Sequence, residues 1–296
     1  ASGMAAVAAV FGVCLRPGDA VVLPAESYYT TRVVASNWLT AIGVTPRLAA
    51  TAGNAQARAV DGARLVWIET PANPTLDVCD IRLLVEAAHQ ANALVAVDNT
   101  TATSYLQPAL TLGADYVICS DTKAMTGHSD LVLGHVATKD AERAAALRTW
   151  RTQQGAVPGP MEVWLAHRSL ATLPLRLSRQ CASAQVVAEF LSTASVVQQV
   201  NYPGLPTHPG HIIARNQMQA FGSVIGFDLG TRDAAERLLR RLILVREATS
   251  FGGIHSTAER RARWGGDAIS EGYIRLSVGC ESAEDIVADL AGALGE

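Results

Sequence analysis

Short, mostly apolar runs alternate with longer amphipathic stretches along the first half of the chain. The runs at 20–23, 65–68, 94–97 and 115–119 have the length and composition of buried strands. Helical patterns separate them, for example over 81–90. Because strands that alternate with helices are typical of βαβ units, we expect an α/β protein with a mostly parallel sheet.

The second half predicts a smaller α+β unit. A helical stretch over 161–179 leads into it, and we expect a kink at Pro174 because proline lacks a backbone N–H. We place the domain boundary near Cys181, which gives a large domain over 1–180 and a small domain over 181–296. The elements expected in the small domain are a helix at 183–191, a strand at 223–229, a helix at 233–242, a strand at 274–278 and a C-terminal helix.

Composition narrows the class of protein. With 49% hydrophobic and 17% charged residues, the chain suits a well-buried enzyme rather than a disordered protein. A net charge of −3 argues against nucleic-acid binding, and no apolar run approaches the ~20 residues that cross a bilayer. The five cysteines are odd in number and far apart, which favours reduced thiols in the cytoplasm. The histidines lack metal-ligand spacing, so we expect no metal site.

Lys123 is the first candidate for chemistry. It is one of two lysines in a chain that otherwise uses arginine, and it follows the apolar strand at 115–119. A lysine at a strand end can form a Schiff base with an aldehyde cofactor, and the hydroxyls of Ser120 and Thr122 are placed to hold a phosphate on that cofactor. A surface lysine after a strand is the alternative.

Residues near the start of the chain could complete a phosphate site. Residues 5–11 are apolar on all faces and predict a buried helix that begins after Ser2-Gly3-Met4. Gly3 would let the backbone approach a ligand, and the free N–H groups of the helix start attract anions. Asp98, at the end of the strand at 94–97, could pair with a protonated pyridine nitrogen, or it could be a turn residue.

Two further side chains have functional and structural interpretations. Tyr28 follows a strand and a turn, where its ring could stack on a cofactor and its phenol could exchange protons. Packing in a partly buried position is the alternative. Arg275 lies within an apolar strand, where burial demands a partner. A substrate carboxylate and a structural salt bridge would both meet that demand.

Taken together, these residues resemble the Cys/Met-metabolism group of fold-type I enzymes that use pyridoxal 5'-phosphate (PLP). The group includes cystathionine γ-lyase, cystathionine γ-synthase and methionine γ-lyase. The similarity extends in family order from the first residues to the last strand. The segments that carry it are 2–4, Glu69-Thr70-Pro71-Ala72-Asn73-Pro74, 97–100, 113–115, Ser120-Asp121-Thr122-Lys123, 127–130, 155–160, 202–206 and 275–279.

The resemblance implies an aminotransferase-like fold of type I, with a mostly parallel sheet in the large domain and a smaller α+β domain. It also implies an enzyme that acts on a small amino-acid substrate and forms a homotetramer, built as a dimer of dimers. In this resemblance, Lys123 would be the Schiff-base lysine and proton shuttle, Asp98 would pair with the pyridine nitrogen and Thr100 would lie beside Asp98. The phosphate would be bound by Gly3, Met4, Ser120 and Thr122, while Tyr28 would stack on the ring and Asn73 would lie near the phenolic oxygen. Ser250 would help to place the lysine and the substrate, and Arg275 would bind the substrate carboxylate.

The expected reaction is γ-elimination from a sulfur amino acid, with cystathionine γ-lyase as first choice. The alternatives are γ-replacement on an activated homoserine, methionine γ-lyase chemistry, and a catalytically silent homologue that acts as an assembly subunit.

The chain also departs from the family pattern. Family members carry a segment before 2–4 that supplies a Tyr-x-Arg pair to a neighbour's phosphate, so we expect natural residues before Ala1. Thr249 stands where cystathionine enzymes often have glutamate. Residues 254–264 are atypical, and we expect the arginines at 260, 261 and 263 to form a solvated helix face.

Overall fold

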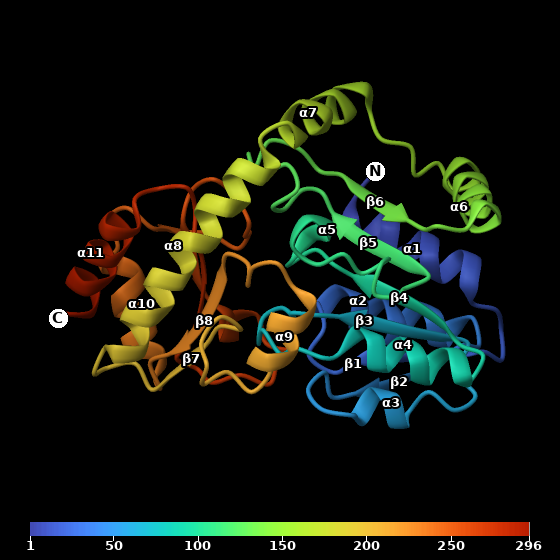
Figure 1. Ribbon diagram of the computed structural model, residues 1–296, viewed down its shortest axis with the longest axis horizontal. Helices are drawn as coiled ribbons and strands as arrows, with labels where there is room; N and C mark the ends of the chain where they lie inside the picture. The colour runs from blue at the N-terminus through green and yellow to red at the C-terminus, as the bar shows by residue number, and fades with distance from the viewer. Residues whose placement is uncertain (296) are drawn as a thin grey trace.

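The computed structural model describes residues 1–295, which form two sheets with helices around them (Figure 1). The first sheet has six strands in the order β2-β1-β3-β4-β5-β6, and all neighbours are parallel except β5 and β6. The expected mostly parallel sheet is therefore confirmed. Its strands are β1 (Ala20–Pro24), β2 (Thr45–Ala49), β3 (Leu65–Glu69), β4 (Leu94–Asp98), β5 (Tyr116–Ser120) and β6 (Gly134–Ala137).

Helices cover both faces of this sheet, which explains why its central strands are apolar on both sides. Leu65 and Trp67 of β3 pack on one face with α1, while Val66 and Ile68 pack on the other face with α4. The helices of this part are α1 (Gly3–Cys14), α2 (Tyr29–Val34), α3 (Ala55–Arg58), α4 (Ile81–Gln90), α5 (Thr103–Leu106), α6 (Ala141–Gln153) and α7 (Pro160–Leu170), with a π-helical turn at Ala35–Leu39.

The second sheet lies apart from the first, on the side of the yellow-to-red segments in Figure 1. Its order is β7-β8-β11-β10-β9, and only β9 and β10 are parallel. The elements are α8 (Leu173–Thr193), β7 (Gln199–Asn201), α9 (His211–Gln217), β8 (Val224–Asp228), α10 (Arg232–Arg241), β9 (Arg246–Glu247), β10 (Thr257–Arg260), a 3-10 turn (Arg261–Trp264), β11 (Tyr273–Ser277) and α11 (Ala283–Leu294).

The helical stretch at 161–179 differs from the prediction of one kinked helix. The chain breaks at Ala171 and Thr172, and Pro174 lies in the first turn of the new helix α8. A proline in the first turn costs no helical hydrogen bond, because that N–H has no partner within the helix. The separate helix expected at 183–191 is the second half of α8.

The two halves of α8 have different packing partners. Leu173, Leu177 and Cys181 pack against Leu106 and Ala124 of the first unit. The residues from Ala184 to Leu191 pack into the core of the second sheet. This change of partners supports our proposal of a large domain over 1–180 and a small domain over 181–296.

Candidate active site

The carboxyl ends of four parallel strands meet at one edge of the large sheet. Tyr28 follows β1, and Glu69, Asp98 and Ser120 are the last residues of β3, β4 and β5. Open α/β sheets place ligands at this edge because the loops that leave the strands diverge there. A cavity of about 240 Å³ lies at this edge. Its lining includes Ser2, Gly3, Met4, Tyr28, Glu69, Asn73, Asp98, Thr100, Ser120, Thr122, Lys123 and Phe251.

All the predicted cofactor-contacting residues therefore surround one cavity. The two predicted substrate residues, Ser250 and Arg275, lie next to it. Ser250 Oγ is 3.2 Å from Lys123 Nζ, and Arg275 Nη1 is 2.6 Å from Asn73 Oδ1. The tertiary structure thus brings together residues that are up to 272 positions apart, from Gly3 to Arg275. Their roles toward a cofactor or substrate remain proposals.

Asp98 is buried at the end of β4 and is held by Thr100. Its Oδ1 accepts hydrogen bonds from the Thr100 hydroxyl at 2.6 Å and from the Thr100 N–H at 3.1 Å. The same hydroxyl accepts a bond from Ser120 N–H at 2.9 Å, so it links the ends of β4 and β5. Burial raises the pKa of Asp98, although the bonds from Thr100 oppose the shift. A cation beside Asp98 would stabilise the ionised form of this carboxylate.

The start of α1 faces the end of β5 at very short range. A Cβ added at Gly3 would lie 2.7 Å from both Cβ and Oγ of Ser120, so only glycine fits this approach. Ser2 caps the helix by accepting a hydrogen bond from Ala5 N–H at 3.0 Å. The first N–H groups of a helix have no partner within it, and they attract anions. Together with the hydroxyls of Ser120 and Thr122, they form a donor set that fits the phosphate of PLP.

Lys123 also lines this cavity. Its Nζ donates to Ser250 Oγ and lies 5.4 Å from the centre of the Phe251 ring. Burial, and secondarily the charge of Arg275, lowers the pKa of Lys123. A lowered pKa leaves a larger share of this lysine as the neutral amine, which is the form that acts as nucleophile and general base.

Glu69 is a site residue that the sequence analysis missed. It is 4% exposed, and its two oxygens accept the backbone N–H of Tyr28 at 2.7 Å and of Asn73 at 2.8 Å. One carboxylate thus fixes two residues that line the cavity. Burial and the adjacent Asp98 raise the pKa of Glu69 to about 8. The available signal was an acidic residue that closes an otherwise apolar strand.

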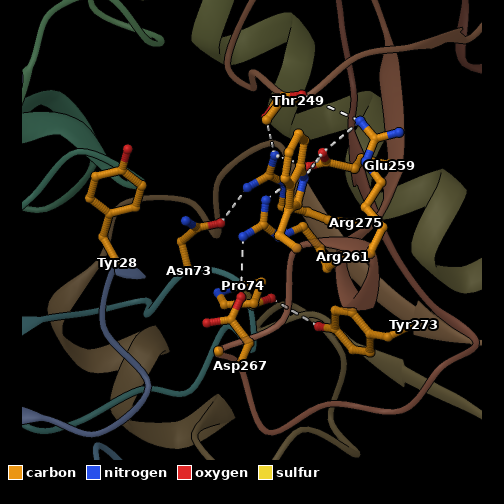
Figure 2. Close-up of polar contacts among 12 residues, drawn as sticks. Tyr28, Asn73, Pro74, Thr249, Glu259, Arg261, Asp267, Tyr273 and Arg275 are labelled. Atoms are coloured by element: carbon orange, nitrogen blue, oxygen red, sulfur yellow. Dashed lines mark hydrogen bonds and ion pairs between the residues drawn. The ribbon is translucent and has the colours of Figure 1, made fainter. Parts of the chain in front are cut away.

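Arg275 is buried and partly paired. Nη1 donates to Asn73 Oδ1, and Nη2 donates to the Thr249 carbonyl and to Glu259 Oε2, the last at 3.1 Å (Figure 2). The structural salt bridge considered as an alternative therefore exists, and it uses only part of the guanidinium. Burial and the nearby Arg261 lower the pKa of Arg275 to about 10, which leaves it charged at neutral pH.

The prediction of a solvated helix face for the arginines after Glu259 was wrong. Arg260 ends β10, and Arg261 and Arg263 lie in a short 3-10 turn. Arg260 and Arg261 are buried, while the Arg263 side chain is 32% exposed. Arg261 is paired with Glu259 at 2.9 Å and Asp267 at 3.2 Å. The carboxylates that bind these arginines come from distant positions or from the opposite side of a turn, which charge spacing alone does not reveal.

Comparison with known proteins identifies the family. Residues 1–295 match the family model described as Cys/Met metabolism PLP-dependent enzyme. The chain belongs to this family, so it is a PLP-dependent enzyme of carbon–sulfur amino-acid metabolism with the type I fold.

Three similar proteins illustrate the range of the family. A Streptomyces coelicolor protein named "Putative cystathionine gamma-lyase" is 55% identical over all of this chain and 75% of its own length. The apo structure of a methionine gamma lyase from Micromonospora echinospora has 42% identity and a TM-score of 0.94, covering 99% of this chain and 80% of that one. A Xanthomonas oryzae cystathionine gamma synthase in complex with cystathionine has 36% identity and a TM-score of 0.96, covering 99% and 79%.

The close approach of Gly3 to Ser120 gives a test of the phosphate site. Gly3→Ala should push Ser120 away and weaken PLP binding about tenfold or more, the scale of one charge-assisted hydrogen bond. PLP titration of the apo protein measures the dissociation constant. Gly292→Ala is the control, because a Cβ at that helical glycine meets nothing within 4 Å. Equal PLP affinity in Gly3→Ala and the wild type would contradict this site.

The raised pKa of Glu69 predicts how the apo protein responds to pH. Between the ordinary glutamate value of 4.5 and about 8, the folded chain holds a proton that the unfolded chain releases. Glu69 should therefore contribute a fall in the free energy of unfolding as pH rises through this window, of at most about 1.4 kcal/mol per pH unit. Glu69→Gln should flatten the dependence in urea unfolding measured from pH 5 to 8.

The control for this prediction is Glu86→Gln, which changes an exposed glutamate on α4. It should keep the wild-type slope. A Glu69→Gln slope as steep as that of the wild type would show that another group holds the proton.

Proposed function

We propose that this enzyme catalyses γ-elimination from a sulfur amino acid, with cystathionine as the first substrate to test. The observation that carries the proposal is the position of Lys123. Its amine lies 3.2 Å from Ser250, at the edge of a cavity that has Asp98 on one wall and Arg275 just beyond Asn73. An amine so placed can reach the α- and β-carbons of an amino acid whose carboxylate is bound by Arg275.

PLP and the protein side chains would have different roles in the reaction. When bound, PLP supplies an aldehyde that captures the substrate amine and a ring that withdraws electrons from its α-carbon. Asp98 would hold a proton on the ring nitrogen, because a buried carboxylate favours a cation beside it. Gly3, Met4, Ser120 and Thr122 would bind the phosphate. Thr100 would keep Asp98 in place.

Lys123 and the residues around it would act on the substrate. Lys123 would take the proton from the α-carbon and move protons at the β-carbon, helped by its lowered pKa. Arg275 would hold the α-carboxylate, and Ser250 would orient the lysine. Tyr28 is 41% exposed at the mouth of the cavity, where it could stack on the ring and give a proton to the leaving sulfur.

We also propose that the enzyme is a homotetramer in the cytoplasm, made as a dimer of dimers. Several large apolar side chains on α7 and the start of α8 are exposed, among them Trp164 at 60% and Leu175 at 74%. Exposed apolar side chains gathered on one segment are typical of subunit interfaces. Among residues 1–295, no helix is both long and apolar enough to cross a membrane.

An assay of the PLP-loaded protein tests the proposed reaction. γ-Elimination from cystathionine consumes one water and releases cysteine, 2-oxobutanoate and ammonia. Incubation with cystathionine should therefore produce 2-oxobutanoate and cysteine in equal amounts. Pyruvate and homocysteine would instead show cleavage at the β-carbon. Turnover of only O-succinylhomoserine with a thiol would favour γ-replacement, and turnover of methionine alone would favour a methionine γ-lyase. No turnover of any of these would favour a silent homologue.

Replacement of Lys123 tests the residue assignment. Lys123→Ala should lose the visible absorbance of lysine-bound PLP, and its turnover should fall by at least ~10²-fold because the proton carrier is absent. Lys139→Ala is the matched control, since it removes the other lysine of the chain. A Lys123→Ala protein that keeps both colour and activity after dialysis would contradict the assignment.

Thr249 gives a test of substrate choice. It is exposed, and it directly precedes Ser250. Thr249→Glu should raise kcat/KM for cystathionine relative to methionine, because a carboxylate here can pair with the distal amino group. We expect up to about fivefold, the scale of an exposed ion pair. Thr249→Gln has similar size and no charge, so it should leave the ratio unchanged. A ratio that changes equally in both variants would remove charge from the explanation.

A further inference from the structure

Glu259 occupies an unusual position beside the proposed carboxylate-binding arginine. It lies on β10 directly opposite Arg275 on β11, and its side chain is fully buried. Oε2 accepts from Arg275 Nη2 at 3.1 Å and from Arg261 Nη1 at 2.9 Å. Oε1 accepts from Arg263 Nη2 at 3.0 Å and from Trp264 Nε1 at 2.6 Å. A single carboxylate thus joins three guanidinium groups and an indole. Figure 2 shows Glu259 with two of these arginines, Arg261 and Arg275.

These contacts extend from the small sheet to the large domain. Arg261 also pairs with Asp267 at 3.2 Å, and Asp267 pairs with Arg32 of α2 at 2.5 Å. Arg32 in turn donates from Nε to the Ser27 carbonyl at 2.9 Å, directly before Tyr28. One network of ion pairs and hydrogen bonds therefore connects Arg275 with Ser27, the residue before Tyr28.

From this geometry we infer that Glu259 is the positioning residue for Arg275: it holds the guanidinium so that its remaining donors face an α-carboxylate. The inference rests on the proposed function, which assigns the carboxylate to Arg275. Without Glu259, burial of Arg261 and Arg275 would be costly, because the two guanidinium groups would repel each other in a region of low dielectric constant. Arg275 would then turn away from Arg261, and its free donors would no longer face the α-carboxylate.

The charge of Glu259 could also act against carboxylate binding. The negative charge of Glu259 could weaken the attraction of Arg275 for a substrate carboxylate, so that its removal would strengthen binding. Two features favour positioning over this effect. The charge of Glu259 is shared among Arg261, Arg263 and Arg275, so it neutralises Arg275 only in part. In addition, Asn73, Thr249 and Glu259 engage only part of the donor set of Arg275, so a ligand can still bind.

Two unreactive ligands isolate the carboxylate contribution. L-Norleucine carries an α-carboxylate and no leaving group, and n-pentylamine is the same chain without the carboxylate. Binding of each to the PLP-loaded protein is followed by the change in the visible spectrum of bound PLP. The ratio of their dissociation constants reports the preference for a carboxylate. Amine basicity is the same in every variant, so only a change in this ratio is informative.

Glu259→Gln should lower the preference for norleucine about tenfold or more, the scale of one hydrogen bond to a charged group. Pentylamine and PLP affinities should stay near wild type. With a sulfur amino acid as substrate, KM should rise more than kcat falls. Glu247→Gln is the matched control, because Glu247 pairs with Arg263 at 2.6 Å, whereas the partners of the Arg275 side chain are Asn73, Thr249 and Glu259. It should keep the wild-type preference.

The outcomes that overturn the inference are distinct. An unchanged or higher preference in folded Glu259→Gln overturns it, as does an equal loss of norleucine and pentylamine binding, which would make the role purely structural. If Glu259→Gln does not fold, Glu259→Asp replaces it. Its shorter side chain cannot span both Arg261 and Arg275, so the preference should fall at least about threefold, and an unchanged value overturns the inference.

Other results would reject the proposed function rather than the role of Glu259. Arg275→Ala serves as reference, and a wild-type preference in that variant would show that Arg275 does not bind the carboxylate. Absence of sulfur amino-acid turnover in the wild type would reject the proposed reaction, while the two ligands would still measure the role of Glu259.

Discussion

Two carboxylates, Glu69 and Asp98, lie side by side at the carboxyl ends of β3 and β4, and the rest of the site is arranged around them. Neither can be buried without compensation. Glu69 is compensated by the backbone N–H groups of Tyr28 and Asn73, and Asp98 by Thr100. The same bonds fix the loops after β1 and β3 and connect β4 to β5. The cost of burying these two acidic side chains at the sheet edge is thus offset by contacts that also shape the cavity.

The small domain contributes the other half of the site through a second set of buried charges. Arg275 reaches Asn73 from β11, and the pair Arg32–Asp267 joins α2 to the loop after the 3-10 turn. Both contacts join elements around the second sheet to elements around the first. A shift of the small domain would therefore move the proposed substrate contact relative to the cofactor pocket. The long helix α8, which packs against both units, limits such a shift.

The sequence was sufficient to predict much of this arrangement. Strands β1, β3, β4 and β5 are nearly continuous apolar runs, because helices cover both faces of the sheet, and such runs are easy to recognise. The strands β2 and β6 were not predicted. β2 contains Pro46 and Arg47 and lies at an edge of the sheet, and β6 is only four residues long, so neither has the apolar pattern of a central strand.

The motifs and their order along the chain carried the resemblance that implied the family and the cofactor. Local pattern placed Gly3, Asp98, Ser120 and Lys123 each at or just after a strand end or at a helix start. Only the tertiary structure decided the partners of buried charges. Glu69 and Glu259 act through contacts with residues at other strands and turns, and the arginines after Glu259 are buried because carboxylates meet them from several elements. Pairing of charges across a fold depends on where strands are placed relative to one another, and the period of a single segment contains no such information.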